Sequence, residues 1–135
     1  MSAGSLEAGI YSKLTADSGA GGVATLATGG IYNTQAKPRA TLPLVIFNVS
    51  DDGIPQRFSG DVIDAEFTVE VIADKELGIT PVNAIVDRLF TLLDNDSITI
   101  SGYNGGNVQC LNRGQAITDV DVLRNVSVYH VHANT

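Results

Sequence analysis

The chain has 135 residues, which suits one domain, so we expect residues 1–135 to fold as a single unit. Its net charge is −7, from 8 basic and 15 acidic residues. This balance argues against sequence-independent nucleic-acid binding, which requires clustered lysine and arginine side chains. It is compatible with DNA passing along an acidic wall without sticking to it.

Cysteine content and hydropathy restrict the cellular compartments in which the protein is expected. The single cysteine, Cys110, excludes an intrachain disulfide, and its apolar neighbours indicate a small strand filler rather than a nucleophile. The first residues show no basic region followed by an apolar stretch, so we expect no signal peptide. No apolar run approaches the roughly 20 residues that span a membrane. We therefore expect a protein made and kept in the cytoplasm, without membrane contact.

The N-terminal part predicts one helix followed by a loop. Leu6, Ile10 and Leu14 recur every four residues and predict a helix over residues 6–15. Residues 19–30 are rich in glycine, but they match neither the spacing of a phosphate loop nor that of a dinucleotide fingerprint. We interpret this segment as a flexible or locally remodelled loop.

Two strands are predicted in the middle of the chain. Residues 44–49 are rich in β-branched and aromatic side chains, and Pro43 stands at their start, where a missing N–H does least harm. Residues 64–73 alternate cleanly between apolar and polar side chains, which predicts a strand with one buried face. A turn signal, residues 51–53, follows the first of these strands.

A second helix is the clearest predicted element. Thr80 is a suitable N-cap and Pro81 a suitable first helical residue. Six apolar residues then follow at helical spacing and predict a wide face for packing on a sheet: Val82, Ile85, Val86, Leu89, Phe90 and Leu93.

The C-terminal part predicts three strands. Residues 97–100 and 107–111 read as short strands, and the intervening Asn-Gly pair is a strong hairpin signal. Residues 122–132 alternate again, with Ser127 and Tyr129 on the opposite face from His130. The element order predicts an α+β fold, in which two helices pack on one face of a mostly antiparallel β-sheet with long loops.

The residues offer little support for catalysis. His130 and His132 share one face of a strand and could bind one metal ion, but no third ligand is indicated. No Gly-x-Ser-x-Gly elbow is present, and nothing supports pairing Cys110 with a histidine. The carboxylates lack the calcium-loop pattern, and the absence of tryptophan disfavours a sugar groove. We expect no catalytic residue, no metal and no cofactor, and we predict that the protein is not an enzyme.

The linear pattern resembles the tail-terminator, or tail-completion, proteins of long-tailed phages and gene-transfer particles. The resemblance runs from about residue 6 to the final strand, and it differs at residues 101–107, which have no counterpart. The matching segments are the first helix, an Ile-Tyr pair, a Leu-Pro-led strand, an alternating strand and the following helix: residues 6–14, 31–32, 42–47, 67–73 and 81–93.

This resemblance implies a structural virion protein. Such proteins form a hexameric ring at the head-proximal end of the tail tube, stop tube polymerisation and provide the joint to the head–tail connector or stopper. The implied partners are further copies of the chain, the tail tube protein and the connector, while DNA passes through the lumen without specific binding. The implied location is the tail or neck of the virion, assembled in the host cytoplasm.

A ring needs a heterologous contact, in which one patch docks on a different patch of the neighbour. We expect the long loops to supply it. Aromatic and arginine side chains dominate interface energetics, so the candidate anchors are Tyr32, Arg39, Arg57 and Phe58; each is alternatively an ordinary loop residue. Candidates for an acidic lumen are Asp51, Asp52 and Asp61, which are alternatively solvated turn residues.

Three other functions compete with this prediction. Another head–tail joining ring protein of the neck is one, although stoppers tend to be small β-barrels, which the second helix disfavours. A small ligand-binding or enzymatic α+β domain would instead hold a closed apolar pocket. A domain that binds a peptide at its sheet edge would leave its final strand unpaired.

Overall fold

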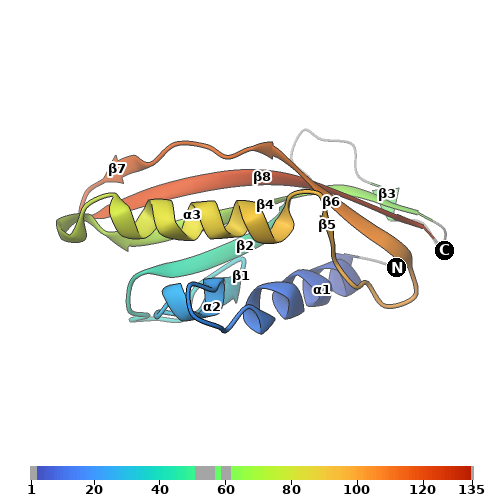
Figure 1. Cartoon of the computed structure of the whole chain (residues 1–135), viewed down its shortest axis with the longest axis horizontal. Helices are drawn as coiled ribbons and strands as arrows, with labels where there is room; N and C mark the ends of the chain where they lie inside the picture. Colours follow the sequence, from blue (N-terminus) through green and yellow to red (C-terminus); the bar gives the residue numbers. More distant parts are fainter. Residues whose placement is uncertain (1–2, 51–56, 59–61, 135) are drawn as a thin grey trace.

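The computed structural model describes residues 3–50, 57–58 and 62–134, and these form an α+β fold, as predicted. The described helices cover one face of an eight-stranded, mostly antiparallel sheet, and the other face is left open (Figure 1). The helices are α1 (Ala3–Ala16), α2 (Val23–Leu26) and α3 (Thr80–Leu93), with the 3-10 helix η1 (Lys75–Leu77) before α3.

The sheet has the strand order β1-β2-β4-β8-β6-β5, with β3 paired to β4 and β7 paired to β8. Every pairing is antiparallel except that of β1 with β2. The strands are β1 (Ile31–Asn33), β2 (Leu44–Ser50), β3 (Arg57–Phe58), β4 (Val62–Asp74), β5 (Asp96–Ser97), β6 (Asn104–Asn112), β7 (Ile117–Asp119) and β8 (Val122–Asn134).

The first helix confirms its predicted stripe, since Leu6, Ile10 and Leu14 are fully buried. The predicted glycine-rich loop, in contrast, contains the single-turn helix α2. The Asp17 carboxylate accepts a hydrogen bond from the Val23 N–H at 2.8 Å and so satisfies a free donor at the start of α2. Asp17 lies six residues before Val23, whereas a capping side chain usually comes from the residue directly before the helix.

The two longest strands, β4 and β8, pair along their whole length and form the centre of the sheet. Their alternate residues are buried against the helices, as predicted, and the Phe67 and Tyr129 rings stack there with centroids 5.6 Å apart. The intervening side chains form the open face, where Thr68 and Val128 are directly opposite each other. The final strand, β8, lies between β4 and β6 in the described sheet, so it is not a free edge.

Helix α3 buries five of its six predicted apolar residues, and Phe90 is half-buried. The Arg113 guanidinium lies 4.5 Å from the Phe90 ring centroid, so it covers part of the ring in a cation–π geometry. The predicted N-cap was wrong: Thr80 is already helical, and Ile79 precedes it without any side-chain cap. The Ile79 carbonyl accepts from the Asn83 N–H at 2.9 Å, which extends the helix one residue earlier.

The predicted C-terminal hairpin exists with shifted boundaries. β5 is only two residues long, whereas the Asn-Gly-Gly segment predicted as a loop forms the start of β6. Gly106 has φ of +61°, and a Cβ there would lie 2.0 Å from the Ile98 carbonyl oxygen. Glycine thus allows the strand to approach residue 98 closely. The outer edge of β6 is further covered by Asp94, whose carboxylate accepts from the Cys110 N–H at 2.8 Å.

Candidate interaction surface

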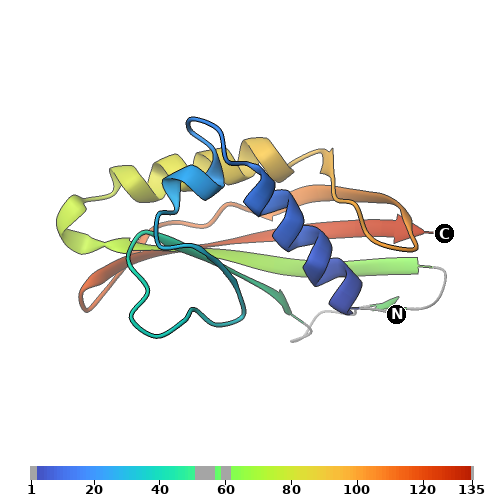
Figure 2. The same cartoon turned by 90° about the horizontal axis from the view of Figure 1, so that it is seen from below.

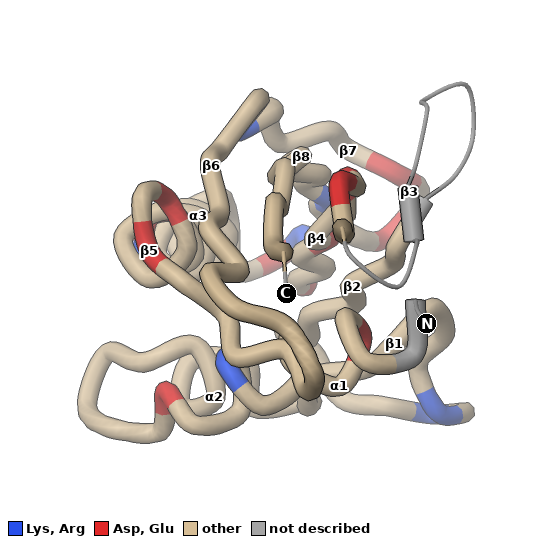
Figure 3. Tube along the Cα trace, turned by 90° about the vertical axis from the view of Figure 1, so that its right-hand side faces the viewer, with Lys and Arg blue, Asp and Glu red and all other residues tan. Residues whose placement is uncertain are grey.

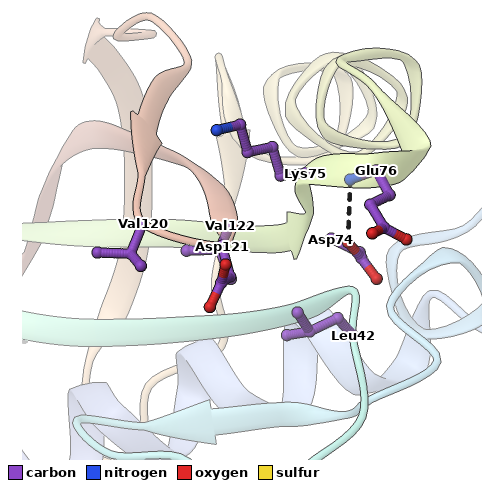
Figure 4. A pocket seen from close by; sticks show the side chains of 7 residues that line it. All are labelled: Leu42, Asp74, Lys75, Glu76, Val120, Asp121 and Val122. Atoms are coloured by element: carbon purple, nitrogen blue, oxygen red, sulfur yellow. Dashed lines mark hydrogen bonds between the residues drawn. The ribbon is translucent and has the colours of Figure 1, made fainter.

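A hollow of about 680 Å³ lies at one end of the sheet, where three segments distant in sequence meet. They are the residue before the Pro43 turn, the β4–η1 junction and the β7–β8 turn (Figure 4). We call this surface the acidic hollow, and it is lined by Leu42, Asp74, Lys75, Glu76, Val120, Asp121 and Val122.

Backbone contacts fix the walls of the acidic hollow. The Lys75 N–H donates to the Asp121 carbonyl at 3.3 Å, which ties η1 to the β7–β8 turn. The Asp74 carboxylate accepts from the Glu76 N–H at 2.9 Å and so caps η1. The Asp74 and Glu76 carboxylates lie on the Leu42 side of the hollow, whereas the Lys75 ammonium points the other way (Figure 4).

The same end of the molecule exposes large apolar side chains. Val120 at the β7–β8 turn is 83% exposed, and Leu77 in η1 is 61% exposed. Ile79 and Ile117 are also exposed, in the segments that Figure 1 shows beside these two. Four exposed large apolar side chains thus lie at this end of the molecule, and this end is therefore a candidate interaction surface.

A second surface lies in the connection between β1 and β2, which spans residues 34–43; we call its first part, residues 34–41, the basic loop. Figure 2 shows it, in teal, standing off the sheet. Lys37 and Arg39 are exposed in it, and neither forms an ion pair with any residue that the structure describes. Thr34 and Arg39 both have positive φ, 70° and 61°, a conformation that non-glycine residues rarely adopt.

The residues predicted as interface anchors have different surroundings. Arg39 lies exposed in the basic loop. Tyr32 is half-buried, and its hydroxyl donates to the Gly29 carbonyl at 2.6 Å, so it supports its own loop. Arg57 and Phe58 form β3 beside Asp64 and Ile63, but their side chains are outside the described part.

The three predicted lumen carboxylates, Asp51, Asp52 and Asp61, lie outside the described residues. The described acidic residues lie on several elements, near β4 and β7 and also near β5 and α2 (Figure 3). On the open face Arg124 pairs with Glu70 and, at 3.2 Å, with Asp119. Sequence reasoning missed these pairs because they depend on the β4–β8 and β7–β8 registers.

The two histidines remain on the open face, as their alternation predicted. His130 contacts the Asp64 carboxylate, and His132 is directly opposite Asp64 in the strand register. Among the described residues, no group of three or more His, Cys, Asp or Glu side chains is placed to hold a metal ion. Burial raises the pKa of the Cys110 thiol, which favours its protonated form.

Beneath the sheet, Tyr129 is fully buried, and burial raises the pKa of its phenol. The Cys110 thiol lies beside the hydroxyl, but a thiol is a weak acceptor, and the hydroxyl has no conventional hydrogen-bond partner among the described residues.

We expect Tyr129→Phe to leave the free energy of unfolding unchanged or to raise it by up to about 1 kcal/mol, because it removes a buried polar group without a partner. Urea denaturation monitored by circular dichroism measures the change. Tyr129→Ala is the control and should cost about 3–5 kcal/mol, since it also removes the ring. A clear loss in Tyr129→Phe would show that the hydroxyl has a strong partner.

None of the helices in the described ranges is both long enough and apolar enough to cross a membrane.

Comparison with known proteins gives a match in fold. No protein-family model matches the chain, and no curated protein does. A chain from the virion of a native gene transfer agent particle is similar in structure, with a TM-score of 0.74 and 22% sequence identity over 98% of this chain and 97% of that chain. A second solved structure, of a protein without a descriptive name, matches at a TM-score of 0.64 and 16% identity, over 100% and 96% of the two chains.

The match with the virion chain covers nearly all of both proteins, so the two share one complete fold rather than a common substructure. At this level of identity the likeness concerns the arrangement of helices and strands.

Proposed function

We propose that this chain is a structural protein of a phage or phage-like particle, of the tail-terminator type. In this role copies form a hexameric ring at the head-proximal end of the tail tube, stop its polymerisation and provide the joint to the head–tail connector. The observation that carries the proposal is the full-length similarity to a virion chain of a gene transfer agent. The linear resemblance to tail terminators supports the same role.

The surfaces of the chain suit a protein that works in an assembly. Exposed apolar side chains are concentrated at one end, and a charged loop, whose cations form no ion pair with any described residue, lies at the β1 edge. In the ring, the predicted anchors Tyr32, Arg39, Arg57 and Phe58 would contact neighbours. The predicted acidic residues Asp51, Asp52 and Asp61 would line a lumen that repels the DNA backbone.

The proposal predicts a defined oligomer. We expect light scattering of the purified protein at rising concentration, alone or with the tail tube protein of the same particle, to give about six times the chain mass of 14.1 kDa. Negative-stain images of the same sample should show rings with a central hole.

A monomer at every concentration, with no response to tube protein, would contradict this function. Rings that bind the connector but never the tube would favour the neighbouring role, that of a head–tail joining ring protein of the neck. The experiment with tail tube protein therefore distinguishes a tail terminator from a head–tail joining ring protein.

A further inference from the structure

Charge is unevenly divided along the chain. Residues 18–50 contain Lys37 and Arg39 and no acidic residue, so their net charge is +2. The remaining residues therefore carry −9, because the whole chain carries −7 and −7 − 2 = −9. The positive segment includes β1, the basic loop and β2, which together form one edge of the sheet.

The acidic hollow has the complementary features. Asp74, Glu76 and Asp121 contribute carboxylates, and Lys75 points away from the Leu42 side on which Asp74 and Glu76 lie (Figure 4). Val120 projects beside them with 83% of its surface exposed. An occupant of this end should therefore offer positive charge together with some apolar surface.

We propose that the basic loop of one copy docks on the acidic hollow of the next copy, with Lys37 and Arg39 against Glu76 and Asp121. This inference rests on the proposed function, since it names the contact between neighbours in the ring. The contact is heterologous, because it joins two different patches, and contacts of this kind can close a ring. Ala36 and Pro38, beside the two cations, offer apolar surface for Val120 to pack against.

The choice of a second copy follows from charge. DNA would be repelled by the hollow, and so would any acidic protein surface. The basic loop carries two positive charges and lies in a segment without acidic residues, 18–50, and within the described part its two cations have no ion-pair partner. Opposite charges on the two patches also steer copies into one orientation and disfavour contacts of like patches.

Charge reversal tests the contact. Lys37→Glu/Arg39→Glu in one variant and Glu76→Lys/Asp121→Lys in another should each raise the concentration needed for assembly by about tenfold or more, measured by light scattering. The chain that carries all four changes should assemble as the natural chain does, because the charges are again complementary. Ser12→Glu/Gln109→Glu, which adds charge at exposed positions away from both patches, is the control and should assemble normally.

Site-specific crosslinking tests the contact directly. All chains carry Cys110→Ser, and one carries Arg39→Cys while the other carries Val120→Cys. Mixing the two under mild oxidation should give a disulfide-linked heterodimer. Replacing Arg39→Cys by Ser12→Cys should reduce the yield to background.

The outcomes separate this inference from the proposed function. If the natural chain and both charge-reversal variants all form rings, and the Arg39→Cys and Val120→Cys chains give no crosslink, the inference is overturned. The proposed function would then still stand. A natural chain that never assembles and gives no crosslink would overturn both. The contact would be established if each charge-reversal variant loses assembly, the chain with all four changes recovers it, and the crosslink forms specifically.

Discussion

Replacing Gly29 with alanine is expected to lower the free energy of unfolding by about 3 kcal/mol or more, because the added methyl group would overlap main-chain atoms. Gly29 lies where the chain entering β1 meets the turn into β2, and its N–H donates to the Pro43 carbonyl at 2.8 Å. A Cβ at this position would lie 1.7 Å from the Thr41 carbonyl oxygen and 2.9 Å from that of Pro43. Backbone atoms cannot avoid the clash by rotating a side chain, so the turn has to move.

Urea denaturation of Gly29→Ala against the natural chain measures this loss. Gly19→Ala is the matched control, since a Cβ there meets nothing within 4 Å. That control should be neutral or more stable by about 0.4–1 kcal/mol, because alanine restricts the unfolded chain. Equal stability of the two variants would mean that the β1–β2 junction is looser than the structure shows.

Removing the Asp17 carboxylate has the second large expected effect, a loss of about 2 kcal/mol in Asp17→Ala. Its two oxygens accept from the Arg88 Nε at 2.8 Å and Nη2 at 2.7 Å, and one of them also accepts from the Val23 N–H. The carboxylate therefore joins the end of α1 to α2 and α3. Its side chain is 12% exposed, so water does not replace these bonds easily.

Asp87→Ala is the matched control for this loss. Asp87 also pairs with an arginine, Arg113, but its side chain is 71% exposed. Exposed ion pairs contribute little, so the control should cost about 0.5 kcal/mol or less. Similar losses in the two variants would contradict a structural role for Asp17.

The Asp17 contribution should also depend on pH. The hydrogen bond from Arg88 and that from the Val23 N–H hold the pKa of this carboxyl below its usual value, against the opposing effect of burial. The contribution is therefore complete above the unfolded pKa of about 3.9 and is lost as pH falls through the lower folded value. The difference in unfolding free energy between the natural chain and Asp17→Ala should be constant from neutral to mildly acid pH and shrink below about pH 4.

The elements predicted from sequence are those with long periodic patterns. Helix α3 and strands β4 and β8 each run for more than ten residues, so their apolar period stands out against local exceptions. Helix α2 was missed because its four residues depend on a cap from Asp17, which no local pattern reveals. The parallel pairing of β1 with β2 was not predicted either, since β1 has only three residues.

The candidate site was predictable only in part. Arg39 was chosen as an anchor because arginine is frequent at interface hot spots, and its role in a contact stays a prediction, although the structure places it in an exposed loop. The acidic hollow could not be predicted, since residue 42, the end of β4 and the β7–β8 turn meet only after the sheet has formed. Tyr32 shows that residue type alone does not identify an interface anchor. Its hydroxyl donates a hydrogen bond to the Gly29 carbonyl, so this aromatic side chain stabilises its own loop.

The covered edge of β6 has a consequence for unwanted contacts between sheets. Sheet proteins at high local concentration can add strands edge to edge and extend without limit into fibrils. Here the Asp94 carboxylate occupies the Cys110 N–H, and the Asn95 N–H occupies the Val108 carbonyl. Strand addition at this edge would have to displace both bonds, which disfavours growth of the sheet by further strands on this side.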